Sequence, residues 1–430
     1  MQQTNSQEYP ILVTIRVRPQ AETQKKNSIK ILDEKNIVIQ NNDQTHQFKF
    51  SKIFKQSNSQ LEIFQSICQP ILFHAIQGQN ASFLVYGQTG TGKTHTMGFH
   101  SNNYLQEPGI IQHSIKFLFD YFQKQKQVWE INLSFMQIYI EEIFDLLNPD
   151  GQKLQIREDT ESNEVYVQNL ITVPVKNQEQ ALKLIEAGLQ YRMQGSQNIN
   201  SLSSRSHTIL NITIQQKITY NEYLVSNIAF VDLAGSERIK KSQSTGIRME
   251  EAKKINSSLS ALSSVISQLY KQQSYIDYRS SKLTRILQNC LNNQSKIALI
   301  ATLEPSEENS FESYSTLLFA SRCQDIQQLP SQSLSNIYQI GNKQDMEIKE
   351  LKDKILYYQI SEDKQNQKDN CKNECIKIAK NLQFVNNIQI NKYYNLKFLL
   401  FNLIYYQIGI TKYRTTFKQN WQQQQFFLRI

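Results

Sequence analysis

SFLVYGQTGTGKTHTM, residues 82–97, is the stretch that decides the fold of this 430-residue chain. Its first residues form an apolar run typical of a strand, and GQTGTGKT (87–94) fits the spacing G-x-x-x-x-G-K-[ST]. Gly87, Gly90 and Gly92 let the backbone approach phosphates closely, so that its N–H groups form an anion nest at a helix N-terminus. The stretch therefore predicts a strand, a phosphate-binding loop and a helix around a nucleoside triphosphate.

A second motif supplies a carboxylate for the same site. Lys93 can place its charge on the β- and γ-phosphates, and Thr94 can offer its hydroxyl to Mg²⁺. VDLAGSE (231–237) follows another strand-like run, which puts Asp232 at the C-terminal end of a strand, where a carboxylate can hold Mg²⁺ through water. Gly235 could present its backbone N–H to a γ-phosphate. Taken alone, DLAG equally fits an ordinary strand-to-loop turn.

The third motif is NSLSSRSH (200–207), with four serines, one arginine and one histidine in eight residues. Such a cluster is too polar for a core. Ser203 and Ser204 could reach Mg²⁺ or the attacking water, and Arg205 could pair with Glu237 across the nucleotide. The alternative for this motif alone is a serine-rich surface loop.

Residues 9–326 alternate short apolar runs with helical patterns, which favours a mostly parallel sheet covered by helices on both faces. The apolar runs are ILVTIRV (11–17), SFLVYG (82–87), INLSFMQIYI (131–140), TILNITIQQKI (208–218) and VSNIAFVDL (225–233). The helical stretches are 60–77, 109–123, 177–193, 249–271 and 280–291.

Composition limits the class of protein. A mean hydropathy of −0.51 excludes a polytopic membrane protein, and five cysteines favour a reducing compartment over a disulfide scaffold. The start, MQQTNSQEYP, lacks the basic and apolar regions of a secretory signal, so we expect none. Of the net charge of +9, residues 366–430 carry +8, from ten Lys and Arg against two Asp and Glu. The body is nearly neutral and must hold any anionic partner through local patches.

The pattern changes after Ile326. Residues 327–342 predict a polar connector, and 343–366 predict either a short capping helix or a weak coiled coil of about two heptads. Residues 367–430 form a basic tail that we expect to be disordered. Its uncharged run, 398–410, is shorter than the roughly twenty residues of a membrane span, so we expect no membrane anchor.

The three motifs, in this order, resemble the motor domain of kinesins, with NSLSSRSH and DLAGSE as its two switch loops. The resemblance covers residues 9–326 and leaves 1–8 as an N-terminal extension. It implies a P-loop NTPase with a central, mostly parallel twisted sheet flanked by helices on both faces. Further matching segments are IRVRP (15–19), PGII (108–111), YIEEIFDLL (139–147), EEAKKIN (250–256), YRSSKLTRILQ (278–288) and LLFASR (317–322).

The resemblance assigns ATP and Mg²⁺ to the site. It implies that Arg16, Arg18 and Pro19 frame the adenine, with His95 near the base. Mg²⁺ would be organised by Thr94, Ser204 and Asp232, partly through water. The phosphates would be held by the loop residues Gly87, Gln88, Thr89, Gly90, Thr91, Gly92, Lys93 and Thr94.

The resemblance also assigns the catalytic groups. Gly235 would sense the γ-phosphate, and Arg205 and Glu237 would form a bridge that closes around the water. Ser204 would help to position that water, and Glu237 would help to relay its proton. We interpret His207, at the end of the serine-rich motif, as structural. These roles agree with phosphoryl transfer, which relies mainly on positioning and electrostatics.

The implied partner is the microtubule, whose surface is acidic, and no nucleic acid is expected. Basic side chains that could meet it are Lys240, Lys241, Arg248, Lys253, Lys254, Arg279, Lys282 and Arg285. Their attraction should weaken with added salt. The loop holding Gly235 runs into the helix beginning near Met249, which offers a route from the nucleotide to the filament.

The expected function is an ATP-driven microtubule motor in the cytoplasm, at the cytoskeleton. A motor at the N-terminus, followed by a neck linker at about 323–336 that docks on it, implies plus-end movement. Two alternatives remain: a microtubule-binding protein that no longer moves, and a P-loop NTPase of another class, such as a GTP switch. The first draws on positions that depart from the family pattern, namely Ser257, Ser263, Asp277, Ser280, Asn292, Asn293, Cys323, Gln324 and Gln328.

Overall fold

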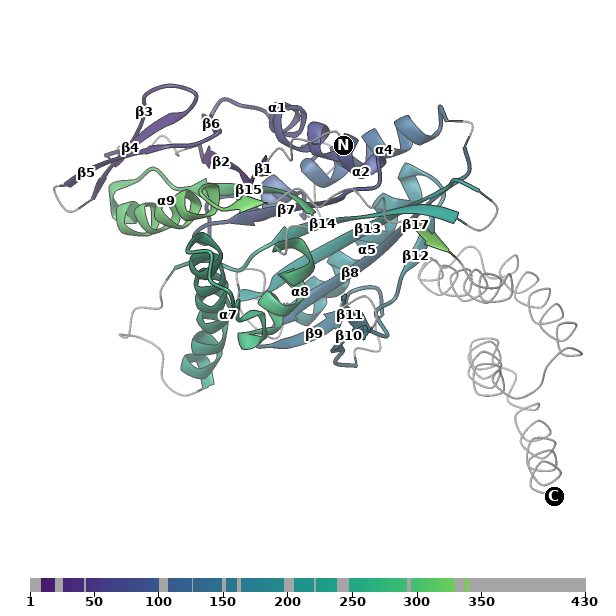
Figure 1. Ribbon diagram of the computed structural model, residues 1–430. Helices are drawn as coiled ribbons and strands as arrows, with labels where there is room; N and C mark the ends of the chain where they lie inside the picture. The colour runs from purple at the N-terminus through teal and green to yellow at the C-terminus, as the bar shows by residue number, and fades with distance from the viewer. Residues whose placement is uncertain are drawn as a thin grey trace, which may run out of the picture. The chain divides into compact units, whose positions relative to one another are not determined.

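The computed structural model divides the chain into two units, residues 1–341 and 342–430. Every described residue belongs to the first unit (Figure 1). The N-terminal extension 1–8, the predicted neck helix 343–366 and the tail 367–430 lie outside the described residues, so those predictions stay open. The described ranges are 9–19, 26–41, 44–99, 107–125, 127–148, 152–160, 164–196, 205–219, 222–237, 247–291, 295–328 and 337–339.

A central sheet organises this unit (Figure 1), in the order β12-β8-β13-β14-β7-β15-β2-β6, with β9 and β17 attached to β8 and β14. The predicted fold class is confirmed in that helices flank a central sheet, but the sheet is mixed and not mostly parallel as predicted. The strands are β2 Leu12–Val17, β6 Lys52–Phe54, β7 Asn80–Tyr86, β8 Trp129–Tyr139, β9 Glu142–Asp145, β12 Val173–Val175, β13 His207–Lys217, β14 Glu222–Asp232, β15 Ser295–Leu303 and β17 Ile337–Gln339.

The sheet is parallel over one half and antiparallel over the other. The pairs β14–β7, β7–β15, β15–β2 and β2–β6 are parallel, whereas β13–β14, β8–β13 and β12–β8 are antiparallel. Only residues 218–221 join β13 to β14. A parallel crossover needs a dozen residues or more, so this connection must be a hairpin. Strand β7 lies in the parallel half and is buried on both faces, as its unbroken apolar run requires.

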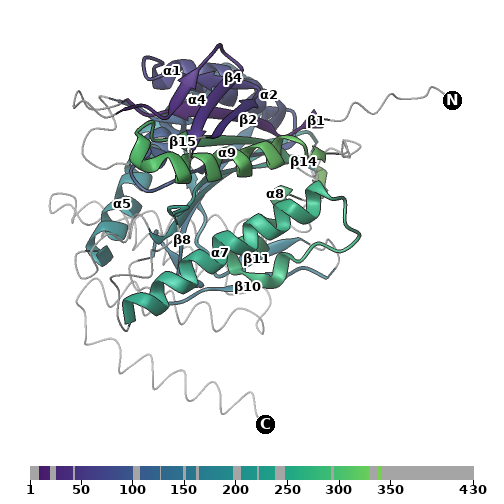
Figure 2. The same ribbon diagram turned by 90° about the vertical axis from the view of Figure 1, so that its left-hand side faces the viewer.

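Two groups of helices cover the sheet. In one group α2 contacts β7 and β14, α5 contacts β8, and α4 packs on both helices. In the other group α8 and α9 contact β15, and α7 packs on α8 and α9 (Figure 2). The helices are α1 Gln60–Ile63, η1 Phe64–Cys68, α2 Gln69–Ile76, α3 Lys93–Met97, α4 Ile110–Phe122, α5 Gln178–Ser196, α7 Ile247–Tyr270, η2 Tyr278–Ser280, α8 Lys282–Leu291, η3 Glu307–Asn309 and α9 Ser310–Gln324.

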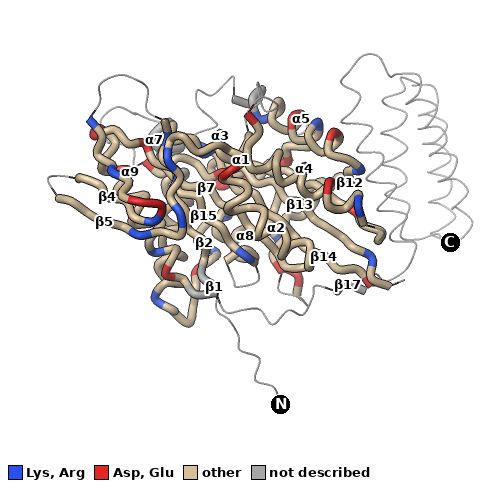
Figure 3. Tube along the Cα trace, turned by 90° about the horizontal axis from the view of Figure 1, so that it is seen from above, with Lys and Arg blue, Asp and Glu red and all other residues tan. Residues whose placement is uncertain are grey.

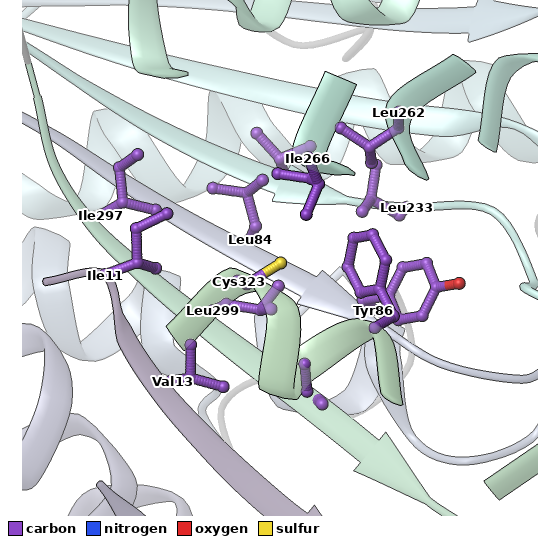
Figure 4. Packing of buried hydrophobic residues seen from close by; sticks show 14 of the residues in the cluster. Ile11, Val13, Leu84, Tyr86, Leu233, Leu262, Ile266, Ile297, Leu299 and Cys323 are labelled. Carbon is purple, nitrogen blue, oxygen red and sulfur yellow. The ribbon is translucent and has the colours of Figure 1, made fainter. Parts of the chain in front are cut away.

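The core beneath the second group joins α7 to the strand that leads into the phosphate loop (Figure 4). Leu84 and Tyr86 of β7 lie in one cluster with Leu262 and Ile266 of α7 and Leu299 of β15, and all five are buried. Burying each aliphatic side chain of this size contributes about 1.5–3 kcal/mol. Apolar packing therefore holds α7 against the parallel half of the sheet.

Two small sheets were not predicted from the sequence. β3 Ile29–Ile31, β4 Asn36–Asn41 and β5 Gln44–Lys49 form an antiparallel sheet, and β10 Gln155–Glu158 pairs with β11 Val165–Gln168 as a hairpin. β5 and β10 alternate half-buried with exposed side chains, and β3 and β11 are only three and four residues long. Such strands lack the continuous apolar run by which the central strands were recognised.

The chain after α9 returns to the sheet. β16, Gln327–Gln328, pairs antiparallel with β1, Tyr9–Pro10, near the N-terminus. β17 then pairs antiparallel with the first residues of β14, from Glu222↔Gln339 to Leu224↔Ile337. Both ends of the segment predicted as a connector are therefore paired with strands of the first unit.

Charge is spread over the described body. Acidic and basic residues are interspersed along the chain trace (Figure 3), as expected from a net charge near zero in residues 1–365. Among the described residues, the helices are too short or too polar to cross a membrane. The apolar run 398–410 lies outside them.

Candidate functional site

The phosphate loop, residues 87–94, runs from the end of β7 into the first turn of α3, as predicted. Gly92 caps α3 with φ 97°, a left-handed conformation that side chains with a Cβ rarely adopt. At Gly87, a Cβ would lie 2.4 Å from the carbonyl oxygen of Thr302. Thr302 also meets Thr91, whose hydroxyl lies 2.6 Å from its own, and Gln88 donates a 2.7 Å hydrogen bond to Asn309. The loop is thus held from β15 and the segment after it.

Lys93 folds back over this loop. Its Nζ donates hydrogen bonds of 2.9 Å to the carbonyl oxygens of Gly87 and Gln88, and the side chain is buried. Burial lowers the pKa of Lys93, and the carboxylates of Asp232 and Glu237 oppose that shift. The ammonium group therefore supplies a buried positive charge at the point where phosphate oxygens would approach the loop.

Thr94 and Asp232, two of the three residues predicted to organise Mg²⁺, are in direct contact. Thr94 Oγ1 donates a 2.8 Å hydrogen bond to Asp232 Oδ2, and Asp232 is only 2% exposed. Burial raises the pKa of Asp232, while Arg192 and Lys93 act to lower it. Asp232 Oδ1 is buried and has no hydrogen-bond partner among the described residues.

This donor set fits Mg²⁺. A hydroxyl and a carboxylate are hard oxygen ligands, and Mg²⁺ commonly binds through one or two carboxylates, waters and substrate phosphates. A cation would also satisfy Asp232 Oδ1, which is otherwise left without a partner. Ser204, the third predicted ligand, lies outside the described residues.

Glu237 lies on the phosphate loop. Its carboxylate accepts a 2.8 Å hydrogen bond from the backbone N–H of Thr89 and a second from the Thr89 hydroxyl. Gly235 lies between these groups, and the backbone N–H of Ser236 donates to the carbonyl of Gly87 at 3.1 Å. The DLAGSE loop, residues 232–237, is therefore bonded directly to the loop that would hold the phosphates.

The predicted bridge between Arg205 and Glu237 is not among the ion pairs of the described residues. Arg205 is half-buried at the start of the described part of the serine-rich motif. Glu237 meets Thr89 instead, so the bridge stays a prediction for a state in which Glu237 has left the phosphate loop.

Two of the residues predicted to frame the base, Arg16 and His95, are joined through Gln60. Arg16 Nη1 donates to Gln60 at 2.9 Å and to the hydroxyl of Thr96 at 2.7 Å, and burial lowers its pKa to about 10. Gln60 also donates to the carbonyl oxygen of His95 at 2.6 Å, and the His95 ring lies 3.0 Å from Glu107. Gln60 and Glu107 were not predicted. They occur in no motif, so only the fold reveals them.

Arg18 reaches the loop from the other side. Its guanidinium donates to the carbonyl oxygen of Gly90 and lies 3.5 Å from Glu304. Pro19 is exposed next to it. Arg16 and Arg18 of the IRVRP segment thus contact Gln60 and the phosphate loop, and the place of this segment beside the nucleotide stays a prediction.

The predicted filament-binding side chains are only partly described. Lys240 and Lys241 lie outside the described residues, as do the side chains of Arg248, Lys253 and Lys254 in α7. Those on and beside α8 are described, and two of them share one acid. Arg279 pairs with Glu158 at 3.0 Å and Arg285 pairs with the same carboxylate oxygen. Bonding to Arg285, and then to Arg279, holds the pKa of Glu158 below its usual value.

Asp277, which departs from the family pattern, and Lys282, in the same segment, each make a local structural contact. Asp277 caps η2, accepting a 3.2 Å hydrogen bond from the backbone N–H of Arg279. Its own backbone N–H donates to Gln268 of α7 at 2.8 Å. Lys282 N–H, at the start of α8, donates to Glu141 at 2.7 Å. Glu158 and Glu141 lie in segments whose sequence gives no sign of their contact with α8.

Comparison with known proteins identifies the family. The family model named kinesin motor domain matches residues 16–326, almost three quarters of the chain. The chain belongs to the kinesin motor domain family. Kinesin motor domains are ATPases, so the enzyme class predicted from the three motifs is confirmed at that level.

Individual kinesins are similar over the same region. The chain is 35% identical to "Kinesin-like protein KIN-7D, mitochondrial" of Arabidopsis thaliana and to "Kinesin-like protein Klp68D" of Drosophila melanogaster, over 75% and 76% of its length. It covers only 31% and 40% of those two proteins. A solved chain, titled "Structure of a fast kinesin: Implications for ATPase mechanism and interactions with microtubules", aligns with a TM-score of 0.70 and 33% identity. That alignment covers 78% of this chain and 98% of the other.

Proposed function

We propose that this kinesin motor domain hydrolyses ATP with Mg²⁺ and uses the energy to move along microtubules toward the plus end. The observation that carries the proposal is the bonding of the DLAGSE loop to the phosphate loop, through Glu237 and Thr89. A γ-phosphate would enter beside Gly235, where these two loops meet. Binding or loss of the γ-phosphate would then change the position of the DLAGSE loop and of the segment that leads toward α7.

The residues of the candidate site would divide the steps of that reaction among them. The loop N–H groups and Lys93 would bind the phosphates, and Thr94 and Asp232 would hold Mg²⁺. The cation, when bound, would neutralise charge on the β- and γ-oxygens. Glu237, once released from Thr89, would meet Arg205 and accept the proton of the attacking water. Ser204 would orient that water, by family resemblance.

Movement would be transmitted through α7 and the segment after α9. The backbone pairs β1–β16 and β17–β14 support a docked neck linker in this kinesin. A linker docked in one nucleotide state and released in another would convert a change at Gly235 into displacement of whatever follows it. Dimerisation through residues 343–366, and a place on microtubules in the cytoplasm, remain part of the proposal.

One observation favours the non-motile alternative. Glu158 already pairs with Arg279 and Arg285, two of the predicted filament contacts, which lowers the charge available to an acidic filament. A protein with weakened contacts could still bind nucleotide. We therefore keep a microtubule-binding kinesin without motility as the second candidate.

The test uses the full chain. ATP turnover is measured with and without polymerised tubulin at low salt, with GTP as a second substrate, and gliding of filaments over the immobilised protein is then recorded. Strong stimulation with directed gliding supports the motor. Filament binding without gliding supports the second candidate, and turnover of GTP in preference to ATP would point to an NTPase of another kind.

A further inference from the structure

His207 connects β13 with the DLAGSE loop and with α7. It is the first residue of β13 and the last residue of the serine-rich motif, and only 3% of it is exposed. Its Nδ1 accepts a 3.0 Å hydrogen bond from the backbone N–H of Ala234, in the DLAGSE loop. Its Nε2 lies 2.9 Å from the hydroxyl of Ser258, on α7. One buried ring thus contacts the γ-phosphate-sensing loop and the helix that would face the filament.

The ring has a fixed direction of hydrogen bonding. A backbone N–H can only donate, so Nδ1 must be the unprotonated nitrogen, and Nε2 then carries the proton and donates it to Ser258. Burial, with a smaller contribution from Lys93, lowers the pKa of His207 to about 3. The imidazole is therefore neutral at physiological pH and keeps this one tautomer.

The link is short where the chain path is long. Along the backbone, Ala234 and Ser258 are separated by residues 235–257, part of which lies outside the described residues. Through His207 they are joined by two hydrogen bonds and one ring. Ala234 is the neighbour of Gly235, and Ser258 lies in the middle of α7, after the basic residues predicted to meet the filament.

The apolar contacts of this part of α7 are of a different kind from the bond to His207. Leu259, Leu262, Val265 and Ile266 are buried in an apolar cluster. Apolar packing is non-directional and tolerates small shifts of a helix. A hydrogen bond weakens steeply when its angle or length changes. His207 is anchored by the pairing of β13 with Ile138 of β8, so the bond to Ser258 specifies one position of α7 against the sheet.

We propose that the Ala234–His207–Ser258 chain couples the DLAGSE loop to α7, and that Ser258 is a positioning residue for filament-stimulated ATP turnover. This rests on the proposed function, because it concerns how the filament and the nucleotide influence one another. A displacement of Gly235 by the γ-phosphate would draw Ala234 with it and strain its bond to the ring. The ring must then turn or release Ser258, and either event changes the preferred position of α7.

The chain offers a matched set of serines for the test. Ser258 is 3% exposed, while Ser257 and Ser260 on the same helix are exposed. Full-length wild type, Ser258→Ala, Ser257→Ala and Ser260→Ala are compared for ATP turnover with and without polymerised tubulin. Filament affinity is measured with ADP and with a non-hydrolysable ATP analogue, and folding is checked by thermal unfolding.

For Ser258→Ala we expect basal turnover within about twofold of wild type, since Ser258 lies on α7 and is not one of the residues assigned to the nucleotide or Mg²⁺. The ratio of the two filament affinities should shrink by about fivefold or more, the lower end of a typical coupling between sites. Filament-stimulated turnover should fall with it, and both control variants should match wild type. A change in folding alone would not alter the dependence of filament affinity on the nucleotide.

The outcomes separate the coupling from the function. A wild type that filaments do not stimulate overturns the proposed motor function. Stimulated wild type with an unchanged Ser258→Ala variant overturns the coupling and leaves the function standing. If Ser258→Ala unfolds below assay temperature, Ser258→Thr and Ser258→Val replace it. Threonine and valine have nearly the same volume as each other, and only threonine carries a hydroxyl. Stimulation retained by Thr and lost by Val supports the link, and equal values overturn it.

Discussion

The backbone N–H of Thr89 donates a 2.8 Å hydrogen bond to the carboxylate of Glu237, and the Thr89 hydroxyl donates a second. These two bonds close the phosphate loop against the DLAGSE loop. The space between them is filled: a Cβ on Gly235 would lie 2.2 Å from Thr89 Oγ1 and 2.4 Å from Glu237 Oε2. Glycine is required at 235 because the side chains of Thr89 and Glu237 approach its Cα too closely for a Cβ. Its backbone conformation is not the reason, because its φ lies outside the left-handed region.

Gly235→Ala should therefore separate nucleotide binding from turnover. The added methyl must push Glu237 and Thr89 apart and move the 235 N–H away from the γ-phosphate. We expect kcat to fall by about a hundredfold or more, as when one oxyanion donor is lost. Affinity for a fluorescent ADP analogue should change little, because ADP lacks the γ-phosphate. Ser236→Ala is the control, since its backbone bond to Gly87 is kept. Equal turnover in wild type and Gly235→Ala would contradict this account.

The metal pair makes a prediction that does not depend on turnover. Thr94→Ala removes the hydroxyl that donates to Asp232 Oδ2 and that would bind Mg²⁺. The gain in nucleotide affinity on adding Mg²⁺ should fall by about tenfold to a hundredfold, the usual effect of disturbing a ligand or its support. Thr94→Ser keeps the hydroxyl and should keep the gain. Titration of nucleotide in Mg²⁺ and in EDTA measures it, and an undiminished gain in Thr94→Ala would remove Thr94 from the metal site.

The strand, phosphate loop and helix of residues 82–97 could be predicted because the local sequence determines them. Glycines at 87, 90 and 92 require a tight loop wherever they occur, and the unbroken apolar run before them requires a strand buried on both faces. The five predicted helical stretches all contain helix, from Gln60–Ile76 to Lys282–Leu291. α9 was missed, since its hydrophobic residues follow no clear helical period and only LLFASR was noted within it.

Contacts made across the fold could not be predicted. The sequence around Thr89 does not indicate that Glu237, 148 residues later, accepts a hydrogen bond from it. Glu158 lies in a short hairpin, and its meeting with Arg279 and Arg285 depends on how α8 packs against β10 and β11. The antiparallel half of the sheet was within reach of the sequence, because only four residues join β13 to β14.

Glu158 should act as a brake on filament binding. Its carboxylate holds Arg285, whose side chain is 14% exposed, and Arg279, which is 72% exposed. Glu158→Gln keeps a hydrogen-bond acceptor and removes the charge, so both guanidinium groups become available to an acidic surface. We expect filament affinity at low salt to rise by about twofold to fivefold, the scale of exposed ion pairs, and to fall more steeply with added salt.

Glu142→Gln is the matched control for the charge itself. Glu142 is also a partly exposed acid in an ion pair. Its partner is Lys153, at 2.7 Å, and not an arginine on or beside α8. Removing its charge changes the net charge by the same amount. Cosedimentation with microtubules over a series of salt concentrations compares the two variants. A rise of the same size in both would show that net charge, and not the release of Arg279 and Arg285, sets the affinity.

The buried imidazole of His207 predicts how stability depends on pH. Its pKa is lowered to about 3 in the folded protein, chiefly by burial, while an unfolded chain has the ordinary value of about 6.5. Between these values the unfolded state binds one more proton, so stability must fall as the pH falls below about 6.5 and is unaffected by this group above it. Urea unfolding of wild type and His207→Asn at pH 7.5, 6.5 and 5.0 measures the effect. The free energy of unfolding of wild type should drop by about 2 kcal/mol more than that of the variant between pH 6.5 and 5.0. Parallel curves would mean that the pKa of His207 is not lowered in the fold, and they would contradict the neutral imidazole inferred from its acceptance of the Ala234 N–H.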